Sequence, residues 1–255
     1  MAMHDYSGEV ELIGVFISPW SIRAKWVLEE AGVPYVSTES PADEDALRKR
    51  LGLRPERRLT YPMMVLKDGQ RLMDSLDIAK LAARSRPELF PQGKDVAGWI
   101  HKADSVANLA RSQLAWVKEQ DDLVLAYADS LPADEPMDAR KLKAKARLGR
   151  IIRKYSLESH EQDSDDVYTI LKDVQQRIGD SAFLFSQNLS YADICMALAL
   201  TMFLHGGHKL LPTGPPVSLI GGSPFAKGVV RDFPRLIAWA DALVTEHFPQ
   251  QLQRK

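Results

Sequence analysis

Short apolar runs alternate with helical patterns along the first third of the chain. The runs at 11–17, 33–37, 62–66 and 71–73 have the length and the apolar or β-branched content of short strands. Asp68-Gly69 separates the last two runs and is typical of a tight hairpin turn. The pattern therefore predicts four strands, and it predicts that the last two are antiparallel neighbours.

Helical patterns fill the gaps between these runs. Apolar residues recur on one face of Ser21–Ala31, and the segment 75–85 has a similar period. Ser40, with Pro41 after it and Asp43 in the first turn, is expected to cap a further helix. The resulting order, β-α-β-α-β-β-α, predicts an α/β domain. Its first two strands are parallel because a helix joins them.

Strand signals nearly stop after residue 90, and helical periodicity takes over. We expect an α/β domain at 1–86, a linker at 87–94 and an all-α helical domain at 95–255. A long Gly/Pro-rich loop is expected at 206–233, either as a cover for a site or as a surface connection between two helices. The expected helices of the second domain lie at about 95–130, 137–156, 164–179, 191–205 and 234–247.

Composition narrows the range of functions. Hydrophobic residues are 45% and charged residues 26%, which is normal for a folded globular chain. The formal charge of −1 lacks the basic excess of a nucleic-acid-binding protein, so we expect no nucleic-acid partner. Cys195 is the single cysteine and the six histidines are scattered, so we expect no metal site. Without a signal peptide or a long apolar segment, a cytoplasmic location is expected.

Candidate chemistry lies where strands and helices meet in the first domain. In Ser18-Pro19-Trp20-Ser21, a serine hydroxyl stands at the expected start of a helix, where free N–H groups and the helix dipole favour an anion such as a thiolate. The alternative is that Ser18 or Ser21 only caps the helix. The sequence leaves both interpretations open.

Two further pairs stand at element ends. Tyr61-Pro62 enters the third strand, at one of the few places where a strand tolerates proline. Asp74-Ser75 opens the third helix, where free N–H groups and the Ser75 hydroxyl form a potential carboxylate site. Here, too, a plain cap supplied by Ser75 is the alternative.

Taken together, these motifs resemble a known family. S-P-W-S-x-R after a strand, Y-P before a strand and D-S at a helix start are similar to the thioredoxin-like domain of the cytosolic glutathione S-transferase superfamily, in its serine-type, bacterial-like form. In the second domain, F-L-F at 183–185 followed by L-S-Y-A-D-I at 189–194 resembles another motif of that family, and Ser190 with Asp193 predicts a capping box. D-F-P at 232–234, leading to Trp239, resembles its late helix.

The resemblance implies a thioredoxin-like domain followed by an all-helical domain, and it implies site residues. Ser18 would hold the glutathione thiolate as the catalytic residue. Pro62 would follow a cis peptide bond, so that the backbone of Tyr61 pairs with the cysteinyl part of glutathione. Asp74 and Ser75 would hold its γ-glutamyl group. Glutathione is then a co-substrate, and no metal is required.

The implied function is a glutathione transferase that activates the thiolate for attack on a small hydrophobic electrophile, in detoxification or catabolism. Ether cleavage, isomerisation and dehalogenation remain open, and the alternative is a non-catalytic glutathione-transferase-like binding or scaffold module. Thr60 occupies the position where the family often has a lysine, which leaves the glycyl carboxylate contact open, although Arg57 or Arg58 would be possible substitutes. Ser18 in place of a cysteine argues against the thiol-transferase branch.

The remaining predictions concern partners. Trp20 and Arg111 are candidates for the wall of an apolar co-substrate pocket between the domains. The segment 140–154 carries eight basic residues and no acid, and we interpret it as a solvated helix face rather than a membrane contact, since acidic residues follow at 158–166. A homodimer is implied by the resemblance.

Overall fold

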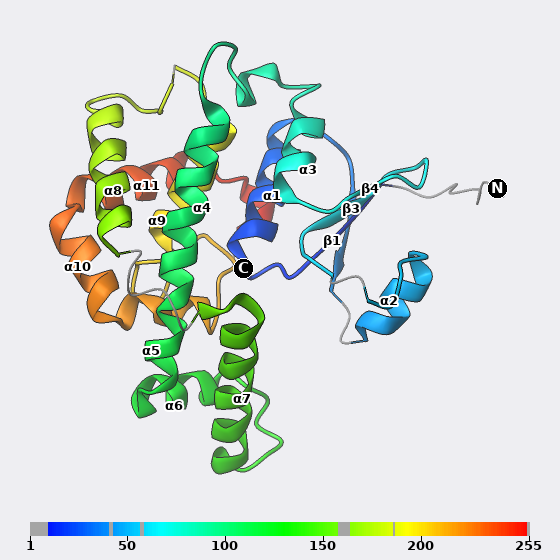
Figure 1. The fold of residues 1–255 in the computed structure, drawn as a ribbon, viewed down its shortest axis with the longest axis vertical. Coiled ribbons are helices and arrows are strands. Elements are labelled where there is room, and N and C mark those ends of the chain that lie inside the picture. Colours follow the sequence, from blue (N-terminus) through cyan, green and yellow to red (C-terminus); the bar gives the residue numbers. More distant parts are fainter. Residues whose placement is uncertain (1–9, 41–42, 57–58, 158–163, 186, 254–255) are drawn as a thin grey trace. The chain divides into compact units, whose positions relative to one another are not determined.

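The chain divides into two compact units. The computed structural model describes residues 10–40, 43–56, 59–157, 164–185 and 187–253. Unit 1 ends at Phe90 and unit 2 begins at Pro91. Each unit has its own core, and each is described by itself below (Figure 1).

A four-stranded sheet forms the centre of unit 1. The strands are β1 (Glu11–Gly14), β2 (Val36–Glu39), β3 (Met63–Val65) and β4 (Arg71–Leu72), in the order β2-β1-β3-β4. β1 and β2 are parallel, whereas β1–β3 and β3–β4 are antiparallel. The predicted strand order along the chain and the hairpin are thereby confirmed.

The described residues of unit 1 also form the α-helices α1 (Pro19–Glu30), α2 (Glu44–Arg50) and α3 (Ser75–Ala82). Figure 1 shows α1 and α3 on one face of the sheet and α2 on the other. A cluster of buried apolar side chains joins α2 to the sheet, and it consists of Ile13, Leu47, Leu51, Leu59, Met63 and Val65. A short 3-10 helix, η1 (Pro87–Leu89), precedes the end of the unit. The thioredoxin-like β-α-β-α-β-β-α prediction is confirmed.

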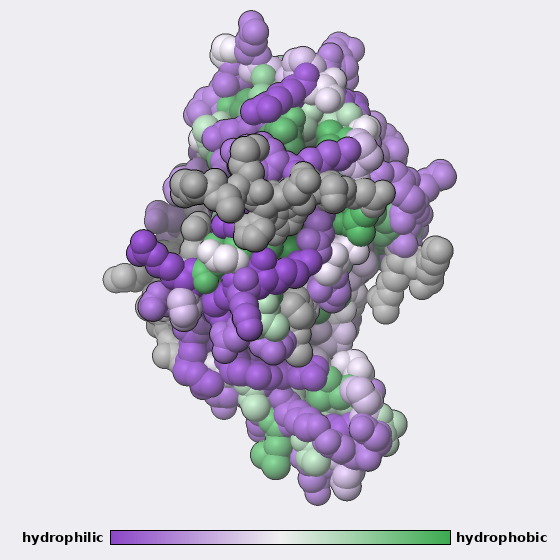
Figure 2. All heavy atoms as spheres, turned by 90° about the vertical axis from the view of Figure 1, so that its right-hand side faces the viewer, coloured by the Kyte–Doolittle hydropathy of each residue, from purple (hydrophilic) through white to green (hydrophobic). Residues whose placement is uncertain are grey.

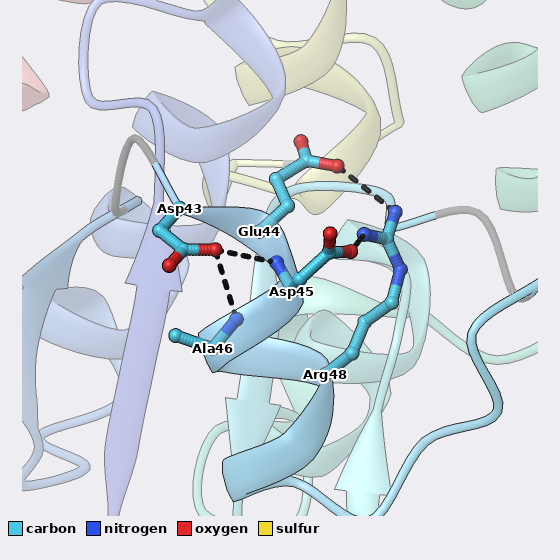
Figure 3. Close-up of polar contacts among 5 residues, drawn as sticks. All are labelled: Asp43, Glu44, Asp45, Ala46 and Arg48. Atoms are coloured by element: carbon cyan, nitrogen blue, oxygen red, sulfur yellow. Dashed lines mark hydrogen bonds and ion pairs between the residues drawn. The ribbon is translucent and has the colours of Figure 1, made fainter.

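The start of α2 differs from the prediction. The cap is Asp43 rather than Ser40, since one Asp43 carboxylate oxygen accepts the backbone N–H groups of Asp45 and Ala46, each at 3.0 Å (Figure 3). Pro41 lies outside the described residues. Sequence reasoning assigned Asp43 to the first turn, but a carboxylate at the cap itself accepts two of the free N–H groups at the helix end.

The described residues of unit 2 form helices and the loops that join them, and no strand. Its central helix is α9 (Tyr191–Thr201), of which every residue is buried, and it packs against α4 and α11. This confirms the all-α second domain. The other elements are α4 (Val96–Ser112), α5 (Leu114–Lys118), α6 (Asp121–Asp129), α7 (Met137–Tyr155), α8 (Ser164–Ile178), η3 (Val217–Gly222), α10 (Pro224–Asp232), α11 (Pro234–His247) and η4 (Gln250–Leu252).

Two segments of unit 2 differ from the prediction. The single helix expected at 95–130 is divided into α4, α5 and α6, with an extended backbone at Gln120 just before the acidic first turn of α6. The loop expected at 206–233 contains η3 and α10, whose cap Ser223 accepts the Ala226 N–H. Ser223-Pro224 is a standard helix start that the surrounding glycines and prolines obscured in the sequence. No helix in the described ranges is both long and apolar enough to cross a membrane.

Candidate functional site

Ser18 lies in the turn between β1 and α1 and occupies the cap position of α1. Its backbone carbonyl accepts the N–H groups of Ser21 and Ile22 at 3.0 and 2.9 Å, and its own N–H donates to the Val15 carbonyl. The side chain makes no cap hydrogen bond, and it is partly exposed. The hydroxyl is therefore available to a ligand at the positive end of a helix of 12 residues.

Ser21 is the second serine of the motif, and it is in a different position. It is fully buried, and its hydroxyl has no hydrogen-bond partner among the described residues. A Cβ atom added at Gly14 would lie 3.0 Å from this hydroxyl, so Ser21 packs closely against the end of β1. Ser18 thus stands at the cap position of α1 and Ser21 does not, and neither side chain makes a cap hydrogen bond.

Tyr61 and Pro62 precede β3, and the peptide bond between them is cis, as the resemblance implied. Pro62 is buried and Tyr61 is partly buried. Burial raises the pKa of the Tyr61 phenol, and the Ser40 side chain opposes this shift. The phenol is therefore neutral at physiological pH and acts as a packing group rather than a charged one.

Asp74 and Ser75 divide their tasks at the start of α3. Asp74 is the cap, because its carboxylate accepts the Leu76 N–H at 2.7 Å. Ser75, which sequence reasoning considered as a cap, is the first helical residue and is buried. No hydrogen bond of the Ser75 hydroxyl occurs within the part of the chain that the structure describes. As at α1, a serine hydroxyl is left available at a helix N-terminus.

Thr60 is linked to the segment just before Asp74 and Ser75. Its hydroxyl donates to the Met73 carbonyl at 3.1 Å and so ties the segment before β3 to the residue before Asp74. The hydroxyl is thus used within the scaffold, and position 60 supplies no cation. Arg57 and Arg58, the possible substitutes, lie outside the described residues.

The two co-substrate candidates lie in different units. Trp20 in unit 1 has the Arg23 guanidinium 5.3 Å from its ring centroid. In unit 2 the Arg111 guanidinium lies 3.7 Å from the ring centroid of Tyr155 and donates to the Asn108 side-chain oxygen at 2.7 Å. Both side chains thus have neighbours of their own, and a shared pocket stays a prediction.

Two other chemical features bear on the site. Cys195 is buried within α9. Among the described residues, no group of three or more His, Cys, Asp or Glu side chains is arranged to hold a metal ion.

Comparison with known proteins now assigns the first unit. The model of the glutathione S-transferase N-terminal domain matches residues 17–85. Residues 17–85 are thus similar to the N-terminal domain of glutathione S-transferases. The match contains Ser18, Tyr61, Pro62, Asp74 and Ser75, and it confirms the family that their motifs indicated. A search of curated proteins finds no match.

Solved structures confirm the glutathione S-transferase fold over nearly the whole chain. A glutathione S-transferase from Methylobacillus flagellatus with glutathione bound has a TM-score of 0.55 at 17% identity, covering 93% of this chain and 95% of that one. A family member from Pseudomonas fluorescens with two glutathione molecules bound has a TM-score of 0.55 at 13% identity, covering 93% and 89%. The Tau class enzyme from mango has a TM-score of 0.53 at 17% identity, covering 97% and 93%.

Proposed function

We propose that the chain binds glutathione in unit 1 and activates its thiol for attack on a small hydrophobic electrophile. The observation that carries this proposal is the Ser18 hydroxyl, which stands at the N-terminus of α1 and makes no cap hydrogen bond. A cap serine normally satisfies a free N–H group of its helix. Here that bond is absent, and both the hydroxyl and the helix end favour an anion.

In the proposed mechanism, Ser18 donates a hydrogen bond to the sulfur of glutathione. The bond is stronger to the thiolate than to the thiol, so it lowers the thiol pKa from about 8.5. Each unit of lowering is about 1.4 kcal/mol and raises the thiolate fraction about tenfold near neutral pH. The proton leaves to solvent, the sulfur lone pair forms the bond to carbon, and the electrophile's leaving group, if it has one, takes the electron pair of the broken bond.

The rest of glutathione would be held at the start of α3 and at the segment before β3. The Ser75 hydroxyl and the free N–H groups of α3 suit the γ-glutamyl carboxylate. The backbone of Tyr61, before the cis bond to Pro62, suits the cysteinyl part. Trp20 and Arg111 are proposed for the electrophile. A homodimer and a cytoplasmic location accompany this proposal as predictions from the family.

A non-catalytic glutathione-binding module is the second candidate, and one observation favours it. Thr60 supplies no cation, and its hydroxyl is bonded to the Met73 carbonyl. A weakened glycyl contact would lower the affinity for glutathione and leave a module that binds without turnover. Ether cleavage, isomerisation and dehalogenation would use the same thiolate as the transferase reaction and differ in the electrophile.

Calorimetric titration with glutathione tests the proposal. We expect binding in the micromolar to millimolar range of small substrates. Ser75→Ala should weaken it about tenfold, as expected for loss of one hydrogen bond to a charged group. Ser85→Ala, at an exposed serine just after α3, is the matched control and should bind like the wild type. Absence of heat and of thermal stabilisation with the wild type would refute glutathione binding altogether.

A further inference from the structure

A basic surface on α7 is not used by the proposed reaction. We define the α7 basic face as Lys143, Arg147, Arg150, Arg153 and Lys154, which are all exposed. Positions 143, 147, 150 and 154 follow the spacing i, i+4, i+7, i+11, so these four side chains form one line along the helix. At 1.5 Å per residue the line is about 16 Å long. Charge of one sign is thus concentrated on a single helix face.

The described residues leave most of this charge uncompensated. Lys143 pairs with Glu135, but no ion pair joins Arg147, Arg150 or Arg153 to another described residue. Like charges three and four positions apart repel one another in a helix. An anionic partner would relieve that repulsion. The charge pattern therefore favours binding of a partner rather than stabilisation of the helix.

The acidic residues that follow α7 were expected to offset it. Asp165 and Asp166, in the first turn of α8, are exposed, and neither has an ion pair to α7 among the residues that the structure describes. Glu158, Glu161 and Asp163 lie outside the described residues. The apolar side of α7 packs inside unit 2 through Ala144, Leu148 and Ile152, so only its polar side is available to a partner.

An exposed leucine distinguishes one kind of anionic partner from another. Leu142 has 71% of its surface exposed, the largest fraction among the exposed large hydrophobic side chains of the described residues. It is exposed on α7, one position before Lys143 and about 100° around the helix from it, at the edge of the basic face. In Figure 2 the lower part of the molecule, which holds α6 and α7, shows mainly hydrophilic residues with several hydrophobic ones among them. Nucleic acid backbones offer such a side chain nothing apolar, whereas a membrane interface offers anionic headgroups above an apolar layer.

We infer that the α7 basic face docks unit 2 onto an anionic phospholipid surface, with Leu142 entering the headgroup layer. The face is an extended set of charges on the exposed side of a helix, which suits a flat field of charges better than a single small anion. Arginine side chains bind phosphate through two parallel hydrogen bonds, which favours phosphate headgroups over a diffuse negative surface. Attachment of this kind is peripheral and reversible, and it is weakened by salt.

Vesicle sedimentation with the full chain tests this inference. We expect binding to vesicles of phosphatidylcholine mixed with phosphatidylserine, and none to phosphatidylcholine alone. Raising the ionic strength from about 0.01 M to about 1 M shortens the screening length from about 30 Å to about 3 Å and should release the protein. Replacing Arg147, Arg150 and Arg153 together by glutamine should weaken binding about a hundredfold, at about fivefold for each residue near the surface.

A matched variant separates this face from net charge. Lys94, Lys172 and Lys227 are exposed in the same unit and have no ion pair among the described residues, so their joint replacement by glutamine makes the same change in charge. That variant should keep nearly all vesicle binding, and equal loss in the two triple variants would overturn the inference. Both variants should retain wild-type thermal melting, which rules out loss of the fold as the cause.

Leu142→Ser separates a membrane from other anions. It should weaken vesicle binding several-fold and leave binding to a DNA duplex, measured as a control, unchanged. Vesicle binding that is unaffected by this substitution, or binding of DNA in preference to vesicles, would overturn the membrane assignment in favour of another polyanion. Binding to neither vesicles nor DNA at low salt would refute the docking surface as a whole.

Discussion

Two helix N-termini in this molecule begin with serine and use it in opposite ways. In unit 2, the Ser190 hydroxyl at the start of α9 accepts the Asp193 N–H, and the Asp193 carboxylate accepts the Ser190 N–H at 2.8 Å. Both side chains are fully buried. In unit 1, Ser18 has the same extended backbone at the start of α1, but its side chain makes no such bond.

The residue three positions later differs between the two helices. At α9 that residue is Asp193, which completes the reciprocal capping box and also accepts the Leu184 N–H at 2.7 Å. At α1 it is Ser21, which is buried against Gly14. A serine reaching back to the cap N–H would have to leave this packing. At α9 the cap serine is therefore held in a reciprocal pair with a carboxylate, and at α1 no such pair forms. A carboxylate is not required for a serine cap, since Ser223 accepts the Ala226 N–H at the start of α10.

The largest effect is expected from removing the partner at α9. Asp193→Ala leaves the N–H groups of Leu184 and Ser190 buried without acceptors, at about 1–3 kcal/mol each. We expect a loss of about 4 kcal/mol in the free energy of unfolding, measured by urea denaturation. Asp180→Ala, at a carboxylate with 98% of its side chain exposed, should cost less than about 1 kcal/mol. A loss at Asp193 as small as that would show that the capping box does not stabilise α9.

The converse is expected at α1. Ser18→Ala removes no cap bond, so the free energy of unfolding should change by less than about 0.5 kcal/mol. The pKa of bound glutathione, followed by thiolate absorbance, should rise by about one unit, and turnover near neutral pH should fall about tenfold. Ser190→Ala is the mirror control, with a stability loss of about 1 kcal/mol and an unchanged thiol pKa. A Ser18→Ala variant that is destabilised with normal thiolate would assign Ser18 a structural role instead.

This comparison also indicates what the sequence alone was able to predict. The capping box of Ser190 and Asp193 is a local pattern, and it was predicted and is confirmed. The order of the strands along the chain, the parallel first pair and the hairpin at Asp68-Gly69 were predicted and are confirmed as well. The cap of α2 was wrong because Ser40 and Asp43 are both good caps, and only the structure shows which one receives the N–H groups.

The hydrogen bonding and burial of each candidate side chain could not be predicted from the sequence. Motif spacing placed Ser18 and Ser75 at helix starts. Whether a hydroxyl is hydrogen-bonded within the protein, however, depends on the packing of residues distant along the chain. The burial of Ser21 depends on close packing against Gly14 in β1, and the bond of Thr60 depends on the Met73 carbonyl beyond the hairpin. Contacts of this kind leave no local pattern to read.

Position 60 offers a smaller test of the same distinction. Thr60→Lys exchanges an exposed hydroxyl tied to the Met73 carbonyl for the cation often found there in the family. We expect glutathione to bind about fivefold more tightly, which is about 1 kcal/mol for a partly exposed charge-assisted contact. Calorimetric titration measures this. Glutathione esterified at its glycyl carboxylate should show no gain, and an equal gain for the ester would place the new contact elsewhere.

The smallest effect is expected at His208, a buried polar side chain in the segment before η3 that bonds within the fold. His208 is buried, its Nδ1 accepts the Leu210 N–H at 3.2 Å, and its Nε2 lies 3.1 Å from the Asp241 carboxylate. Because Nδ1 is an acceptor, the neutral ring carries its proton on Nε2, facing Asp241. Burial lowers the pKa of His208 below its usual value, and Asp241 opposes this shift only in part.

The sign of the resulting pH dependence follows from the lowered pKa. The unfolded chain takes up a proton at His208 near pH 6.5, at a higher pH than the folded chain does. The His208 contribution to stability is therefore complete above about pH 6.5 and is lost as the pH falls below it. His208→Gln keeps a donor toward Asp241 but does not titrate, so the wild type should lose stability relative to this variant on acidification. Urea denaturation across this pH range measures the difference, and His205→Gln, at an exposed histidine, is the control. If the difference in unfolding free energy between wild type and His208→Gln stays constant with pH, the protonation of His208 does not affect the stability of the fold.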